Sequence, residues 1–251
     1  MLEVNISELC LTTLNEKRTI LNNIKFSLPS NKIYTILGKN GSGKSTLLKS
    51  LTGLLEEKSY KVEGYVLFEG QVLFSFEHKK LMAIRKDKIK YIFQDAVNSF
   101  DPLKKLQYYF ELLVKNKEEI ETTLDYFLLP GTEKIYSLHS YEVSGGMAQR
   151  ISFALALLAN PRLIILDEPT SGIDPAIANL FLLKLKEFAD KNDNSVLLVT
   201  QDVTFAKKVS DKIAYLSEGT LSEFYTVRDF LTRKENQSLN QFLEANQKIE
   251  S

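Results

Sequence analysis

One glycine-rich segment constrains the fold of this chain more than any other feature. Residues 38–45 read Gly-Lys-Asn-Gly-Ser-Gly-Lys-Ser and match the pattern G-x-x-x-x-G-K-[ST] in full. An apolar run at residues 33–37 precedes the segment, and leucines at helical spacing follow it up to Leu55. A strand, a glycine loop and a helix form the context in which backbone amides and a helix N-terminus bind phosphate. The alternative, an ordinary glycine turn before a helix, is disfavoured because the strand and the apolar helix are both in place.

The predicted phosphate loop assigns roles to individual residues. Lys44 is expected to reach the β- and γ-phosphates of a nucleotide, and the Ser45 hydroxyl is expected to ligate Mg²⁺. The residues predicted to contact the nucleotide are Gly38, Lys39, Asn40, Gly41, Ser42, Gly43, Lys44, Ser45 and Thr46.

An apolar run that ends in two carboxylates is the second chemical feature. Residues 163–166 are Leu-Ile-Ile-Leu, and Asp167 and Glu168 follow directly. Ligands bind at the carboxyl ends of strands in open α/β sheets. We therefore predict that Asp167 holds Mg²⁺ through water and that Glu168 is catalytic and polarises the attacking water. The alternative is a strand that ends in an acidic turn, and the phosphate loop in the same chain argues against it.

Strand-like and helix-like segments alternate along the chain, which predicts an α/β fold. In one region the pattern is helical instead, because Leu103, Leu106, Phe110 and Leu113 recur with helical period. We therefore predict a small helical insert in an α/β core and a polar, helical tail. The predicted boundaries are 1–225 for the core domain, about 95–143 for the insert within it, and 226–251 for the tail.

Composition narrows the possible partners. The chain has 251 residues with 32 Lys+Arg and 32 Asp+Glu, so its formal charge is +0 and offers no broad attraction to nucleic acid. Cys10 is the single cysteine, which fits a reducing compartment. No signal-peptide pattern is visible at the N-terminus, and the apolar stretch at 151–159 is far shorter than the ~20 residues of a membrane-spanning helix. We expect no nucleic-acid partner, and we expect any link to a membrane to come through another protein.

A third segment, at residues 143–150, resembles the signature of a known protein family. Residues 143–150 read Val-Ser-Gly-Gly-Met-Ala-Gln-Arg and resemble the signature of ATP-binding cassette (ABC) proteins, although an N-capped helix with a glycine entry is the simpler alternative. The resemblance implies a RecA-like phosphate-loop NTPase core with an antiparallel β subdomain and a helical insert, with ATP and Mg²⁺ as ligands. It also implies a head-to-tail pair of cassettes, in which the signature of one subunit holds the nucleotide of the other. The residues implied to act in trans are Ser144, Gly145, Gly146 and Gln149.

Further landmarks follow the order of this family. Gln94 resembles the glutamine that senses Mg²⁺ and contacts the permease, and Asp174 resembles the aspartate of the loop that links the two sites of the dimer. The segments 93–102 and 144–150 are similar to those of peptide and nickel importers. This branch implies an ATP-hydrolysing motor subunit, peripheral on the cytoplasmic face of the cell membrane. The implied partners are transmembrane permease subunits, a second and different cassette, and, indirectly, an extracellular solute-binding protein.

Two other classes compete with the importer interpretation. A soluble, non-transport ABC ATPase that acts on ribosomes or nucleic acid usually fuses two cassettes or carries basic arms, whereas this chain has one cassette and no net charge. A phosphate-loop kinase or GTPase is disfavoured by the signature and by the Asp167-Glu168 pair.

Two positions depart from the family pattern. The switch position, usually His, is Gln201, whose amide can donate a hydrogen bond but cannot titrate near neutral pH. Our hypothesis is that Gln201, at this catalytic position, makes ATP hydrolysis slow at the site built on this chain's own phosphate loop. The complex would then be an asymmetric heterodimer with one weak and one strong ATPase site. The alternative is that Gln201 substitutes adequately for the histidine. The aromatic residue on which adenine stacks would fall at about Cys10 or Leu11, and neither has an aromatic ring. We therefore expect looser nucleotide binding than is usual in the family, unless another aromatic residue takes this place.

Overall fold

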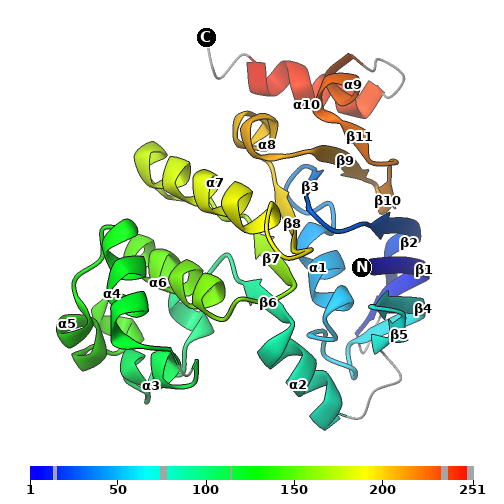
Figure 1. Ribbon diagram of the computed structural model, residues 1–251. Coiled ribbons are helices and arrows are strands. Elements are labelled where there is room, and N and C mark those ends of the chain that lie inside the picture. The colour runs from blue at the N-terminus through cyan, green and yellow to red at the C-terminus, as the bar shows by residue number, and fades with distance from the viewer. Residues whose placement is uncertain (14–15, 74–77, 114, 233–236, 248–251) are drawn as a thin grey trace.

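Two sheets organise the chain in the computed structural model, which describes residues 1–13, 16–73, 78–113, 115–232 and 237–247 (Figure 1). One sheet is antiparallel with the strand order β2-β1-β4-β5. The other is mixed, with the order β10-β9-β3-β8-β7-β6 and with β11 paired to β9. The strands are β1 (Leu2–Thr12), β2 (Lys17–Leu28), β3 (Lys32–Leu37), β4 (Tyr60–Phe68), β5 (Gln71–Val72), β6 (Ile89–Ile92), β7 (Leu163–Asp167), β8 (Ser195–Thr200), β9 (Lys212–Ser217), β10 (Thr220–Leu221) and β11 (Tyr225–Thr226).

The helices lie on both sides of the mixed sheet and beyond its β6 edge (Figure 1). They are α1 (Lys44–Leu51), α2 (His78–Asp87), α3 (Leu106–Glu111), α4 (Lys117–Tyr126), α5 (Thr132–Ser137), α6 (Gly145–Leu158), α7 (Pro175–Ala189), α8 (Val203–Val209), α9 (Val227–Thr232) and α10 (Gln237–Gln247).

The parallel part of the mixed sheet brings the chemical segments to one edge. Strands β6, β7, β8, β3 and β9 run parallel, and every residue of β7 and β8 is buried because helices cover both faces. Leu197 and Val199 pack in the core that contains α1, whereas Val196 and Leu198 pack in the core that contains α7. Parallel strands end at the same edge, so the phosphate loop after β3 lies beside the carboxylates at the end of β7.

The antiparallel sheet packs its inner face on α1. Residues such as Ile6 and Leu21 are fully buried in the same core as Leu47 and Leu48 of α1. The ladder between β1 and β4 is irregular between Ile6 and Glu8, opposite Gly64. A Cβ at Gly64 would lie 2.1 Å from the Asn5 carbonyl oxygen, at a φ of 126°, so only glycine fits this close approach.

A group of helices, α3 to α6, lies beyond the β6 edge (Figure 1). Its buried aromatic residues include Phe110, Phe127 and Phe153. The predicted place of Leu103 on a helix was wrong, because this residue is 85% exposed in the turn before α3. The Leu103 backbone N–H donates to the Asp101 carboxylate at 2.9 Å, and such an Asx turn holds the chain out of the helix until Leu106.

The C-terminal helices α9 and α10 pack against β9 and α8. Phe230 and Phe242 are buried there with Val203 and Tyr215, and the rings of Tyr215 and Phe242 have centroids 5.4 Å apart. Within the described ranges, no helix is both long enough and apolar enough to cross a lipid bilayer.

Candidate active site

The loop from Gly38 to Gly43 turns sharply between β3 and α1. Gly43 is the N-cap of α1 with a φ of 98°, and a Cβ there would lie 3.0 Å from the Leu21 side chain on β2. A Cβ at Gly38 would lie 2.7 Å from the Leu216 carbonyl oxygen on β9. The loop therefore lies between two strands, and glycine is required by close approach to the backbone at Gly38 and by the positive φ at Gly43.

Lys44 connects this loop to the carboxylates. Its Nζ donates to the carbonyl oxygens of Gly38 at 3.0 Å and Lys39 at 3.1 Å. The same Nζ lies 3.1 Å from Glu168 Oε1, and the two side chains are only 6% and 9% exposed. The ammonium group is thus held between the phosphate loop and the end of β7.

Asp167 is oriented by two hydroxyl groups. Ser45 Oγ donates to Asp167 Oδ1 at 2.8 Å, and the Tyr91 hydroxyl on β6 donates to Oδ2 at 3.0 Å. Burial raises the pKa of Tyr91, and the negative charge of Asp167 raises this pKa further. The phenol therefore stays protonated and can donate at neutral pH.

Glu168 carries a buried oxygen atom that lacks a hydrogen bond. The backbone of this residue has a positive φ of 48° where the chain leaves β7. Oε2 accepts from the Gln201 backbone N–H at 3.2 Å, whereas Oε1 accepts no hydrogen bond from the described residues despite its short distance to Lys44. Ser42 Oγ in the phosphate loop is also buried and without a partner in the described part of the chain. Because Glu168 Oε1 is ion-paired with Lys44, Ser42 Oγ is the atom that indicates a site shaped for a further polar ligand.

The oxygen atoms of this site fit Mg²⁺. Ser45 Oγ and the Asp167 carboxylate are hard ligands, and Mg²⁺ is usually bound by one or two such groups together with phosphates and water. Within the described residues no cluster of three or more His, Cys, Asp and Glu side chains could form a separate metal cage.

A cleft of about 860 Å³ joins the site to the other predicted segments. Ser45 and Asp167 line it together with Gln94, which is exposed after β6. Gly145 and Gly146 line it from the start of α6. The fold therefore gathers the phosphate loop, the acidic strand, Gln94 and the glycines of the signature around one cleft.

The remaining predicted residues have roles within their own elements. Gln149 also lines the cleft, but it is buried and its amide donates to the Pro169 carbonyl oxygen at 3.3 Å. Ser144 is the N-cap of α6 and accepts from Met147 N at 3.3 Å. Asp174 is the exposed N-cap of α7 and accepts from Ala176 N at 2.8 Å.

These positions complete a family pattern. The sequence model of the family described as "ABC transporter" matches residues 21–171. The chain belongs to the ABC transporter family.

Known proteins resemble this ABC transporter chain over most of its length. The oligopeptide transport ATP-binding protein AmiE of Streptococcus pneumoniae is 32% identical over 221 residues, which is 84% of this chain and 62% of AmiE. The chain thus spans less than two thirds of that relative. The metal-staphylopine import system ATP-binding protein CntD of Staphylococcus aureus is 29% identical over 255 residues, covering 98% of this chain and 94% of CntD.

A solved structure has the same fold as this ABC transporter chain. It is the dimeric, post-hydrolysis state of an ATP-binding cassette bound to ADP and Pi. The TM-score is 0.79 at 25% identity, over 91% of this chain and 99% of that one. The predicted α/β cassette fold with its antiparallel β subdomain is confirmed, as is the resemblance to the peptide and nickel branch.

Sequence reasoning missed two residues at the site of this ABC transporter chain. Tyr91 has no assigned role in the sequence pattern, and its bond to Asp167 depends on the pairing of β6 with β7. Arg18 on β2 lies directly opposite Leu11 on β1 and lines a second cavity, of about 560 Å³, with Lys39 to Ser42 of the phosphate loop. The signal that could have identified Arg18 is an exposed, positively charged residue on a strand that precedes the phosphate loop.

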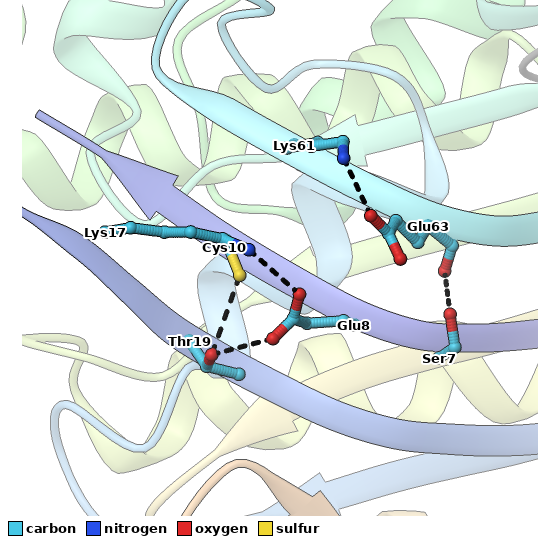
Figure 2. A network of polar contacts seen from close by, with 7 residues as sticks. All are labelled: Ser7, Glu8, Cys10, Lys17, Thr19, Lys61 and Glu63. Atoms are coloured by element: carbon cyan, nitrogen blue, oxygen red, sulfur yellow. Dashed lines mark hydrogen bonds and ion pairs between the residues drawn. The ribbon is translucent and has the colours of Figure 1, made fainter.

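The opposite face of the same β ribbon carries a separate polar network (Figure 2). Glu8 accepts from the Thr19 hydroxyl at 2.9 Å and from Lys17 at 3.3 Å, and Thr19 lies 3.6 Å from the Cys10 sulfur. The hydrogen bond from Thr19 is the main cause that lowers the pKa of Glu8. Residues directly opposite in a ladder share a face and neighbours alternate. Cys10 therefore belongs to the network face, and Leu11 and Arg18 to the other.

Proposed function

We propose that this chain is the ATP-binding and ATP-hydrolysing motor subunit of an ABC importer that takes up a small solute such as an oligopeptide, nickel or another metal chelate. The observation that carries the proposal is the buried cluster of Lys44, Ser45, Asp167 and Glu168, in which Glu168 Oε1 has a cation 3.1 Å away but no hydrogen bond within the described chain. These are the groups that bind phosphates, hold Mg²⁺ and activate water in phosphoryl transfer.

The contacts suggest an order of events. Lys44 contacts Glu168 and two loop carbonyl oxygens. Phosphate oxygens compete for this ammonium group, so binding of ATP would release Glu168 Oε1 to accept a proton from the attacking water. The water oxygen then bonds to the γ-phosphorus and ADP leaves. Bound Mg²⁺, held by Ser45, Asp167 and Gln94, would supply neutralisation of the charge on the phosphates.

An apolar groove on the surface is a candidate binding site for a permease. A cavity of about 610 Å³ lies between β6 and the helical group, and its lining includes Phe93, Phe100, Tyr109 and Leu155. Phe100 is 7% exposed and therefore largely part of the core, whereas Phe93 is half-buried. We assign this groove to a cytoplasmic segment of a permease, which would place the chain at the cytoplasmic face of the membrane. AmiE and CntD, whose names describe transport and import systems, support this assignment.

The same proposal divides the chain into an ATPase unit with a helical insert and a C-terminal tail. Residues 1–225 would form the ATPase unit, with the helical insert at about 95–143, and residues 226–251 would form the C-terminal tail. The insert forms one wall of the groove, so it would transmit motion to the permease. A second cassette, different from this one, would complete the pair, and a solute-binding protein would act indirectly through the permease.

The test is purification of the tagged chain from membranes in detergent, followed by mass spectrometry and an ATPase assay. We expect two permeases and a second cassette to co-purify, and we expect hydrolysis to fall in the Glu168→Gln variant. Glu133→Gln, an exposed glutamate on α5, is the matched control. Recovery of ribosomal proteins in place of permeases would instead support a soluble ABC ATPase.

A further inference from the structure

Tyr91 is the residue that touches both the metal-binding carboxylate and the apolar groove. Its hydroxyl donates to Asp167 Oδ2 at 3.0 Å. Its ring lines the groove of about 610 Å³ together with Phe93. The Tyr91 side chain thus connects the proposed Mg²⁺ ligand Asp167 to the groove proposed to bind a permease.

The hydroxyl holds Asp167 in one orientation. Asp167 is 3% exposed, and its two oxygens accept from Ser45 at 2.8 Å and from Tyr91 at 3.0 Å. The Ser45 hydroxyl is itself a proposed Mg²⁺ ligand and would turn toward the ion. Tyr91 would then be the donor that keeps the Asp167 carboxylate from rotating, and such partners of a ligand raise metal affinity by fixing its geometry.

The ring connects this carboxylate to the groove. The rings of Tyr91 and Phe93 have centroids 4.5 Å apart and are tilted by 40°. Phe93 also lines the cleft of about 860 Å³ beside Gln94. Tyr91 cannot move far without displacing Phe93, because packed aromatic rings have few alternative positions.

We propose that Tyr91 is a positioning residue for Asp167, and that contacts made in the groove reach this carboxylate through Phe93 and Tyr91. The proposal rests on the function assigned above, since it assumes that Asp167 holds Mg²⁺ beside a nucleotide.

The test uses Tyr91→Phe, which keeps the ring and removes the hydroxyl. Binding of a fluorescent, non-hydrolysable ATP analogue is titrated with MgCl₂ and, separately, in EDTA. We expect the Mg²⁺ concentration at half-saturation to rise about tenfold, with affinity in EDTA changed by less than about twofold. Tyr109→Phe is the control, because it removes a hydroxyl from the same groove where that hydroxyl accepts from Asp101 N at 2.6 Å.

A second variant tests the connection to the groove. Phe93→Leu should raise the half-saturating Mg²⁺ concentration severalfold on its own and should add nothing in the Tyr91→Phe background, since the two residues would act as one unit. Additive effects would contradict the connection, and an unchanged Mg²⁺ dependence in Tyr91→Phe would overturn the positioning role. Failure of the unmodified chain to bind the analogue in a Mg²⁺-dependent way would instead overturn the proposed function.

Discussion

At the scale of single residues, each oxygen of the Glu168 carboxylate has a different partner. Oε1 lies 3.1 Å from Lys44, and Oε2 accepts from the Gln201 backbone N–H at 3.2 Å. The backbone of Gln201 is therefore engaged with the proposed catalytic carboxylate, while its side chain is exposed after β8. An imidazole at this position could donate to a bound phosphate with a fixed ring, whereas the glutamine amide has more rotamers and a weaker preference for one of them.

The first prediction concerns Gln201→His. We expect this change to raise the turnover of the chain's own site about tenfold or more, because one transition-state hydrogen bond can be worth ~10²–10³ in rate. The measurement is ATP hydrolysis by the purified complex, with the second site inactivated in the partner cassette. An unchanged rate would show that the glutamine already substitutes adequately.

A second prediction at this scale concerns Arg18. This residue lines the cavity beside the phosphate loop, and its guanidinium group makes no hydrogen bond or ion pair with the described residues. A planar cation can stack on a base, so we expect Arg18→Ala to weaken binding of a fluorescent ATP analogue about tenfold. Lys17→Ala is the control, since Lys17 belongs to the network face with Glu8 (Figure 2). Equal losses in both variants would indicate a general charge effect instead.

At the scale of elements, the helical group is joined to the mixed sheet by aromatic packing. Phe153 on α6 and Phe181 on α7 are both fully buried, and their rings stack with centroids 4.2 Å apart at 8°. Phe127 packs against both, at 5.5 Å and 5.8 Å. Helix α6 begins with the signature, so this packing fixes the helix that carries the signature against α7.

Loss of this packing should be visible in stability. We expect Phe153→Ala to lower the free energy of unfolding by ~3–5 kcal/mol, the usual cost of truncating a buried aromatic residue. Urea denaturation followed by circular dichroism measures it. Leu183→Ala on α7 is the control, because Leu183 is 58% exposed and its loss should cost less than about 0.5 kcal/mol.

At the scale of the whole molecule, the signature glycines are open to other molecules. A Cβ at Gly145 or Gly146 would meet nothing within 4 Å, and neither residue has a positive φ. The chain's own fold therefore does not require glycine there. Small residues at an open helix start instead suit the close approach of a second cassette and its nucleotide.

A change at Gly146 should affect the stability of the chain and the activity of the assembled complex differently. We expect Gly146→Ala to leave the isolated chain as stable as before, or stabler by up to ~1 kcal/mol, since alanine favours the helix. Hydrolysis by the complete complex should nevertheless fall severalfold. Thermal unfolding of the chain and ATPase assays of the complex make the comparison. A parallel loss of both properties would mean that the glycine serves this chain's own fold.

The sequence by itself determined those features whose geometry is local. A glycine loop before a helix, two carboxylates after an apolar strand and a capped helix start each depend on a few consecutive residues. The family could therefore be predicted from the sequence, whereas phosphate binding at residues 38–46 and the roles of Asp167 and Glu168 stay predictions. Leu103 shows how a local turn defeats periodicity.

The tertiary structure alone decided which distant groups meet. Tyr91 reaches the Asp167 carboxylate only because β6 and β7 are paired in register. Ser45 reaches the same carboxylate because β3, which leads into its loop, is separated from β7 only by β8. Arg18 lines a cavity beside the phosphate loop because the register of β1 and β2 shifts between Leu9 and Cys10 and so sets which face each residue occupies. Strand order and register are settled by the packing of the whole core, and no short segment of the sequence encodes them.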